Sequence, residues 1–267
     1  MRLEMYRTLP RLTLRYSGPT EDGNFKIVGN VTSTNIALSY DSESLRDKLQ
    51  AVDITVPLRT EGRKTAHTER WVICRLLSTL ASCGQLAFPV SVAHRDKPDF
   101  LLAQGSRQVG VEATEAISEQ YAAFSALAER EFPDVLLDPG HFRWGSPQKS
   151  VEEMRDILRH GQLTAPPWAG DRPEEEWALS MESIVRVKLG KLARPDFAKF
   201  EENWLAIYHN LPIPNVHLQT ASHRLLPKIA DVWKGTPAFT RIYIEHGPVI
   251  LEIQEHGTAH FVLDDLW

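Results

Sequence analysis

The chain is poor in cysteine, in long apolar runs and in excess positive charge, and each shortage narrows the class of protein. Only two cysteines, Cys74 and Cys83, occur among 267 residues, which argues against a disulfide framework and favours a reducing, cytoplasmic location. No apolar run approaches the roughly 20 residues that span a membrane, and no charged-then-apolar leader opens the chain. We therefore expect no membrane association.

The charge balance also restricts how the chain can bind nucleic acid. The formal net charge is −5, which argues against a surface covered with basic residues for non-specific binding. Any contact with DNA or RNA therefore requires local positive charge. The basic residues that we consider for such contacts are Arg63, Lys64, Arg95, Lys97, Arg224 and Lys228, although surface residues of this kind are usually only solvated.

Several sequence signatures of well-defined chemistry are missing. The chain has no His-Glu-x-x-His or Cys-x-x-Cys zinc motif, no Gly-x-Ser-x-Gly turn and no phosphate-binding loop ending in Lys-Ser or Lys-Thr. The ten histidines are scattered, and His209, His217 and His223 lack the spacing of metal ligands on one element. Zinc, serine-hydrolase and P-loop chemistries therefore rank below the alternative developed next.

The pattern of apolar residues predicts a mixed α/β fold. The apolar positions of residues 68–82 recur at helical spacing. Further helices are expected at residues 42–49, 116–130, 151–160 and 174–193, and strands at 88–92, 97–102, 109–114, 204–208, 241–244 and 249–253. The order of these elements predicts a mixed β-sheet with helices on its faces.

We expect the chain to consist of two regions. Residues 1–60 form a small β-rich N-terminal region, with strands expected at 12–16, 25–28 and 54–57. Residues 61–267 form the main domain. Within it, residues 131–175 are rich in proline, glycine and tryptophan, and they predict an irregular insertion that shapes a cleft.

Two carboxylates mark the predicted hairpin of residues 97–114. Asp99 opens its first strand, and Glu112 lies in the otherwise apolar second strand. Carboxylates on paired strands can lie close enough to hold one divalent cation through their oxygens. We expect Asp99 and Glu112 to bind Mg²⁺ or Mn²⁺, with the backbone carbonyl of Ala113 as a further ligand. Each carboxylate alone also fits a simpler interpretation, as a turn residue or a solvent-facing strand residue.

Three more side chains complete the candidate site. Glu69 lies on the apolar side of helix 68–82, where an unpaired carboxylate is costly to bury, although the helix dipole also favours a glutamate in the first turn. Lys188 and Lys191 are three residues apart on helix 174–193 and share a face. The alternative interpretation of this lysine pair is a solvated basic surface.

Taken together, these residues resemble the PD-(D/E)xK nuclease superfamily. The resemblance rests on Pro98-Asp99, on Glu112-Ala113-Thr114 and on the upstream helix that bears Glu69, and it covers roughly residues 65–210. It implies a restriction-endonuclease-like core in which the aspartate and the second acidic residue bind the metal. It also implies that the helix glutamate supports them and that a lysine positions the attacking water and stabilises developing charge.

The chain departs from the pattern of this superfamily at one position. Thr114 stands where the motif has its lysine, two residues after Glu112. Either the lysine function has moved to the later helix, where Lys188 and Lys191 are placed to supply it, or the site is catalytically inactive. We favour relocation, and Thr114 can still hydrogen-bond a water or a phosphate oxygen.

Two functional hypotheses follow. The first is a metal-dependent nuclease that hydrolyses phosphodiester bonds of nucleic acid, with DNA as the favoured substrate. By analogy with related nucleases, it would pair as a homodimer. The second is an inactive nuclease-like fold that binds nucleic acid or a protein partner, which the acidic net charge and Thr114 favour. The clustered carboxylates favour the nuclease, because like charges repel each other and a scaffold without activity has no reason to keep them together. A raised pKa of Asp99 or Glu112 without metal would fit the same hypothesis.

Tryptophan is a further candidate for contacts with nucleic acid, because its ring can stack on a base. More often tryptophan belongs to the core, as we expect for Trp204 in its apolar strand. The tryptophans considered for stacking are Trp144, Trp168, Trp177, Trp204 and Trp233.

Overall fold

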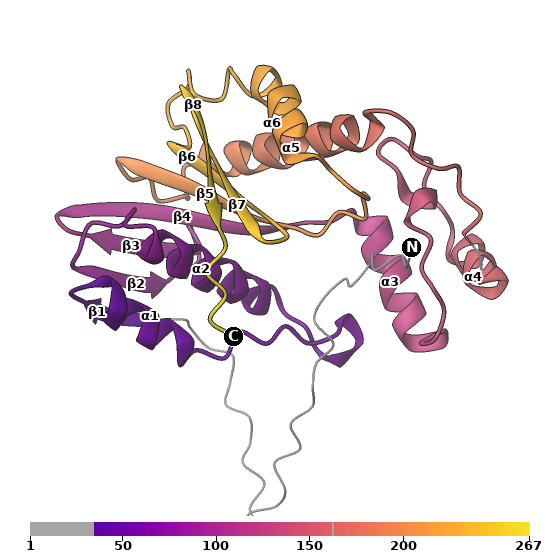
Figure 1. Cartoon of the computed structure of the whole chain (residues 1–267), viewed down its shortest axis with the longest axis horizontal. Coiled ribbons are helices and arrows are strands. Elements are labelled where there is room, and N and C mark those ends of the chain that lie inside the picture. The colour runs from indigo at the N-terminus through magenta and orange to yellow at the C-terminus, as the bar shows by residue number, and fades with distance from the viewer. Residues whose placement is uncertain (1–34, 162) are drawn as a thin grey trace, which may run out of the picture. The chain divides into compact units, whose positions relative to one another are not determined.

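A computed structural model of the chain describes residues 35–161 and 163–267 (Figure 1). The strands expected at residues 12–16 and 25–28 lie outside the described residues. The described chain forms a mixed α/β structure with an eight-stranded mixed sheet and six α-helices. This confirms the prediction of a mixed sheet with helices on its faces.

The strands follow one another across the sheet in the order of the sequence. They are β1 (Ile36–Ser39), β2 (Val90–His94), β3 (Phe100–Gln104), β4 (Arg107–Ala116), β5 (Glu202–His209), β6 (Arg241–His246), β7 (Val249–Gln254) and β8 (Gly257–Val262). Strands β4, β5 and β6 are parallel to one another, and the remaining pairs are antiparallel. Parallel neighbours require long crossover connections, and these connections carry most of the helices.

Helices cover both faces of the sheet, with α2 on one face and α5 and α6 on the other (Figure 1). The helices are α1 (Ser42–Gln50), α2 (Thr65–Ser82), α3 (Glu119–Glu131), α4 (Val151–His160), α5 (Arg172–Leu192) and α6 (Leu218–Leu225). Three short 3₁₀ turns join them: η1 (Arg59–Glu61), η2 (Pro139–Phe142) and η3 (Leu226–Lys228).

The central strand β5 is buried on both faces, as its continuous apolar sequence predicts. Trp204 and Ala206 pack into the core beneath α2. Leu205 and Ile207 alternate with them and pack into the core beneath α5. Because neighbouring strands share this alternation, every side chain of the central sheet faces either α2 or α5.

Some predicted elements differ from the structure. Residues 54–57 form no strand, so that prediction is wrong. Pro57 lacks the N–H that a ladder hydrogen bond needs, and the side chain of Ile54 is instead buried in the core beneath α2. Strand β8 and helix α6 were not predicted, because β8 is a largely exposed edge strand and α6 has only 8 residues.

The connection between β4 and β5 builds a small separate cluster beside the sheet. Helix α3 begins at Glu119 rather than at the expected residue 116, because β4 runs on to Ala116 and Ser118 caps the helix. Helix α4 has the predicted limits. Side chains of α3, η2 and α4 form a third apolar core, which holds the irregular segment of residues 131–175 in place.

None of the helices in residues 35–161 and 163–267 combines the length and the apolar character that crossing a membrane requires.

Candidate functional site

Strands β3 and β4 form the hairpin that the sequence predicts. Phe100 pairs with Val111 in an antiparallel register. Asp99 directly precedes this pair and Glu112 directly follows it, so the register brings the two residues level with each other. An oxygen of Asp99, Oδ2, accepts a hydrogen bond of 2.7 Å from the backbone N–H of Ala113. The hairpin therefore brings the two predicted carboxylates to one point of the sheet.

Helix α5 lays Lys188 against this point. The Nζ of Lys188 donates to Oε1 of Glu112 at 2.7 Å and to the backbone carbonyl of Ala113 at 3.4 Å. The side chains of the pair are only 12% and 7% exposed, so little water screens their attraction. An ammonium group thus meets Glu112 from α5 and not from position 114, where the side chain is that of Thr114.

Helix α2 contributes Glu69 from the other side of the hairpin. Its Oε2 lies 3.3 Å from Nε2 of His94, at the end of β2. Glu69 also lines the same cavity as Asp99 and Glu112. The second turn of α2 therefore adds a third carboxylate to the group.

The negative charge of this group exceeds the positive charge beside it. The pKa of Asp99 is raised to about 8, first by burial and then by the carboxylates of Glu112 and Glu69. The N–H of Ala113 and the ammonium of Lys188 lower it by less. A buried carboxyl beside two like charges takes up a proton or attracts a cation.

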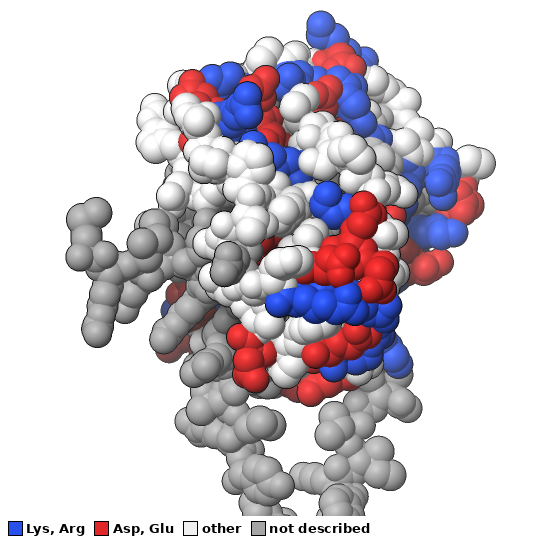
Figure 2. Space-filling model, turned by 90° about the vertical axis from the view of Figure 1, so that its right-hand side faces the viewer, with Lys and Arg blue, Asp and Glu red and all other residues white. Residues whose placement is uncertain are grey.

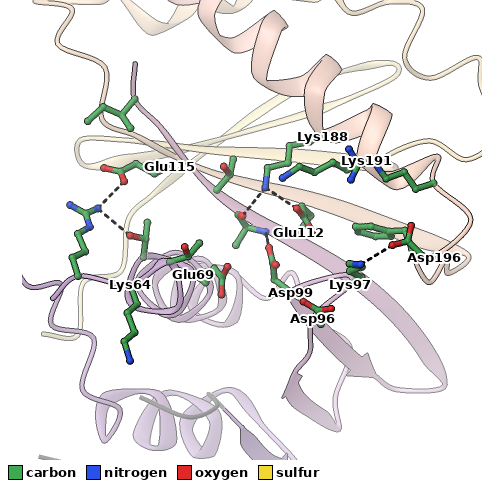
Figure 3. A pocket seen from close by; sticks show the side chains of 18 of the residues that line it. Lys64, Glu69, Asp96, Lys97, Asp99, Glu112, Glu115, Lys188, Lys191 and Asp196 are labelled. Atoms are coloured by element: carbon green, nitrogen blue, oxygen red, sulfur yellow. Dashed lines mark hydrogen bonds and ion pairs between the residues drawn. The ribbon is translucent and has the colours of Figure 1, made fainter. Parts of the chain in front are cut away.

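A cavity of about 600 Å³ opens over these carboxylates (Figure 3). Asp99 and Glu112 lie on the wall that the hairpin forms, and Glu69 faces them from α2. Lys188 and Lys191 extend toward the same wall from α5 (Figure 3). The cavity therefore lies between α2, the hairpin and the C-terminal half of α5.

Basic residues outnumber acidic ones among the residues that line the cavity, whereas acidic residues outnumber basic ones in the whole chain. Seven Lys and Arg residues line it against six Asp and Glu residues, whereas the chain has a net charge of −5. The basic residues are Arg59, Arg63, Lys64, Lys97, Lys188, Lys191 and Arg194. On the outer face shown in Figure 2, Lys and Arg side chains instead alternate with Asp and Glu.

Part of this positive charge is already neutralised. Arg63 and Arg59 approach the carboxylate of Glu115 at 2.8 Å and 3.4 Å. Lys97 donates to Asp196 at 2.7 Å, and both side chains are about half exposed. Asp196 thus balances the charge of Lys97, whereas the single carboxylate of Glu115 balances only one of the two guanidinium groups.

Three other cations of the cavity remain open to a ligand. Among the described residues, the side chains of Lys64, Lys191 and Arg194 form no ion pair. Lys64 and Arg194 are exposed, and Lys191 is half-buried. Cations of this kind bind phosphate oxygens without reading a base sequence.

All predicted site residues line this one cavity. They are Glu69, Asp99, Glu112, Ala113, Thr114, Lys188 and Lys191. Of the basic residues considered for nucleic-acid contacts, Arg63, Lys64 and Lys97 line the cavity, and Arg95, Arg224 and Lys228 are not among its lining residues.

Four charged residues that line the cavity were not predicted from the sequence: Arg59, Glu115, Arg194 and Asp196. Glu115 is three residues from Glu112 on the same strand, and alternation places it on the opposite face of the sheet. That alternation argued against grouping Glu115 with Glu112, although both residues line the cavity. Arg59 and Asp196 lie in connections whose position depends on the whole fold, and no local signal could place them.

The donor set of the hairpin fits a hard divalent cation. Across the described part of the chain, no group of three His, Cys, Asp or Glu side chains could hold a metal ion. Mg²⁺ is commonly held by only one or two carboxylates, with water in its remaining positions. Asp99, Glu112 and the carbonyl of Ala113 are oxygen donors of this kind, and burial together with the neighbouring carboxylates raises the pKa of Asp99.

Comparison of the chain with protein-family models, with curated proteins and with solved structures finds no match. The likeness to PD-(D/E)xK nucleases therefore stays a prediction, which rests on the residues described above. The chemistry of the cavity has to be argued from its own side chains.

Proposed function

We propose that the chain is a Mg²⁺- or Mn²⁺-dependent nuclease with a restriction-endonuclease-like core. One observation carries the proposal. Asp99 and Glu112 lie level with each other on the wall of a cavity that Glu69 also lines, so three carboxylates share one site beside the ammonium of Lys188. An enzyme that hydrolyses phosphodiesters needs such an arrangement, because it has to bind a cation and stabilise developing negative charge in one place.

The metal site of this proposal consists of the Asp99 and Glu112 carboxylates and the carbonyl of Ala113. A bound Mg²⁺ would supply Lewis-acid polarisation of the phosphate and a more acidic water. Glu69 adds negative charge next to Asp99, which favours the retention of a cation.

In this proposal Lys188 performs the function of the motif lysine, whose position is occupied by Thr114. Hydrolysis adds water across a P–O bond, and negative charge grows on the phosphate oxygens and the leaving oxygen. The Lys188 ammonium is held 2.7 Å from Glu112, so it needs no reorganisation to stabilise that charge. Lys191 lies one turn further along α5 and is placed to bind a phosphate oxygen, while Thr114 offers a hydroxyl on the cavity wall.

The substrate of this proposal is nucleic acid, with DNA as the first choice. The open cations Lys64, Lys191 and Arg194 suit a phosphodiester backbone, and their position at the cavity concentrates positive charge on an otherwise acidic chain. A single active site cuts one strand at a time. By analogy with related nucleases, the proposal therefore includes a homodimer that cuts both strands. Sedimentation with and without a DNA duplex tests that part.

The second candidate is a binding module without activity. It is favoured by Thr114 at the lysine position and by the ion pair that already occupies Lys188. In that case the same cavity binds a backbone phosphate or an acidic partner and leaves it intact.

A cleavage assay separates the two candidates. Supercoiled plasmid, linear duplex, single-stranded DNA and RNA are incubated with the protein in Mg²⁺, in Mn²⁺ and in chelator. We expect metal-dependent cutting that is lost in Asp99→Asn and Glu112→Gln and kept in Glu255→Gln, a control at an exposed glutamate away from the cavity. No cutting of any substrate, together with no metal binding by calorimetry, would move the assignment to the binding module.

A further inference from the structure

A second cavity, of about 370 Å³, lies next to the charged one. It is enclosed by the start of α3, the loop between η2 and α4, the N-terminal half of α5 and the loop after β5. Its volume falls within the range of small-molecule sites in proteins. The residues of the irregular insertion therefore build a pocket and do not only connect α3 to α5.

Aromatic rings dominate the side of this pocket that the insertion supplies. Trp144 is 48% exposed, which is costly for so large an apolar ring. The guanidinium of Arg143 lies 4.3 Å from the centre of the Trp168 ring. By contrast, Trp177 and Trp204 are fully buried in the core. Trp144 and Trp168 are thus placed to stack on a flat ligand.

The same pocket concentrates polar atoms that have no partner. In the described residues, eight buried side-chain nitrogen or oxygen atoms lack a hydrogen bond, and three of them belong to residues that line this pocket. They are Nε of Arg143, Nε1 of Trp168 and Oε2 of Glu176. Buried polar groups are nearly always satisfied, so three side chains that line this pocket retain unused donors and an acceptor.

Two elements link this pocket to the charged cavity. Ile117, the residue after β4, lines both. On α5, Ile184 lines the second pocket and Lys188 lines the charged cavity, and four residues of helix span about 6 Å. The two cavities are therefore close enough for one strand to reach both.

We propose that this second pocket binds an unstacked nucleobase of the strand whose phosphate enters the charged cavity. A base offers a flat π-surface for Trp144 and Trp168 and a polar edge for Glu176. A phosphate does not suit the pocket, because Glu119 and Glu176 oppose its single cation, Arg143. The inference rests on the proposed function and narrows its substrate to nucleic acid with single-stranded character, since a base has to leave the duplex stack before it can stack on these rings.

Binding of two single strands in chelator tests the inference apart from cleavage. One is a labelled 12-nucleotide DNA of mixed sequence, and the other has the same phosphates but abasic sugars throughout. Fluorescence anisotropy gives the affinities, and tryptophan emission reports stacking. The full-length chain is compared with Trp144→Ala, Trp168→Leu and a control, Trp267→Ala, whose ring is 39% exposed and lies outside the pocket.

We expect the strand with bases to bind more tightly than the abasic strand and to quench tryptophan emission. Trp144→Ala removes an exposed side chain, so it leaves the fold intact, and it is expected to weaken binding of the strand with bases by about five- to hundredfold. It should leave the abasic strand unaffected, as should Trp267→Ala for both strands. Equal affinity for the two strands, or no binding of either, overturns the inference. The cleavage assay on all four substrates in Mg²⁺ judges the proposed nuclease separately, because it measures cutting of any substrate and not the difference in binding between the two strands.

Discussion

Two glutamates of the same sheet are equally buried and differ in what surrounds them. Glu112 on β4 is 5% exposed and Glu245 on β6 is 6% exposed. Glu245 accepts a hydrogen bond of 3.0 Å from Nε of Arg75, which also pairs with Asp265 at 2.8 Å. Glu112 pairs with Lys188 at 2.7 Å, but it lies at the base of a cavity with further carboxylates beside it.

The difference appears in the pKa values of the two clusters. Burial raises the pKa of Glu245 to about 6, and Arg75 opposes the rise. In the hairpin cluster, burial and two neighbouring carboxylates act together and raise the pKa of Asp99 to about 8. Burial of a carboxylate alone therefore does not mark a site. Uncompensated like charge beside an open cavity is the better indicator.

The strongest way to break this comparison is to neutralise one carboxylate in each cluster. Asp99→Asn or Glu112→Gln is expected to lower metal-dependent cleavage by at least about 10²- to 10³-fold. Glu245→Gln is expected to leave cleavage within about twofold of wild type but to lower the free energy of unfolding by about 1–3 kcal/mol, because Arg75 loses a buried partner. Initial cleavage rates and urea unfolding measure the two effects.

The reverse pattern would contradict the comparison. If Glu245→Gln lost cleavage while remaining folded, the β6 cluster would be functional and the hairpin cluster would have no special status. Glu255→Gln, at an exposed position, controls for the loss of one negative charge.

The next largest effect concerns the lysine of α5. Lys188→Met is expected to lower cleavage by about 10²-fold and to destabilise the fold by about 3 kcal/mol, since it leaves Glu112 buried without a partner. Lys191 forms no such ion pair among the described residues, so Lys191→Met is expected to lower the free energy of unfolding only a little. A double-mutant cycle with Glu112→Gln measures the coupling between Lys188 and Glu112.

Two outcomes of that cycle matter. A coupling free energy near zero would mean that Lys188 does not compensate Glu112. Equal loss of cleavage in Lys191→Met and Lys188→Met, with no change for the exposed control Lys234→Met, would assign the lysine function to Lys191 or to both residues.

The sequence predicts the hairpin cluster well, because its determinants are local. Alternation and a polar turn fix the register of β3 and β4, and the register alone brings Asp99 level with Glu112. The apolar stripe of α2 likewise fixes the face on which Glu69 lies. These residues could therefore be grouped before any fold was known.

The sequence does not determine which lysine reaches Glu112. Lys188 and Lys191 share a face of α5, and only the way the long crossover returns α5 over β4 decides that Lys188 makes the contact. The second pocket is harder still, because residues 131–175 outside the predicted helix 151–160 have no periodic pattern. Trp144 and Trp168 could be named as candidates for stacking, but their place beside Ile117 depends on the packing of α3 and α4.

A moderate effect is expected on the pH dependence of stability without metal. The folded pKa of Asp99, about 8, exceeds its ordinary value of 3.8. Between these values the folded state binds more protons than the unfolded state, so the free energy of unfolding falls as the pH rises through that window. The slope is about 1.4 kcal/mol per pH unit at most.

Urea unfolding at several pH values in chelator measures this slope. Asp99→Asn should flatten it, whereas Glu245→Gln should flatten only the interval from its ordinary pKa of 4.5 to about 6. A slope above pH 6 that persists unchanged in Asp99→Asn would show that the hairpin carboxylates are not short of positive charge.

The smallest effect concerns the open cations, and it extends the comparison from the buried cluster to the cavity mouth. Lys64 and Arg194 are exposed and have no ion pair among the described residues, whereas Lys97 is already paired with Asp196. Each phosphate contact contributes about one unit to the slope of log affinity against log salt concentration. Lys64→Ala or Arg194→Ala should therefore lower that slope by about one, and Lys97→Ala should lower it by less, because Asp196 competes with the phosphate. Anisotropy titrations with the 12-nucleotide strand at increasing salt measure the slopes. Equal slopes for all three variants and the wild type would mean that the backbone does not cross this mouth, so the cavity would have to admit its phosphate from the side of Ile117.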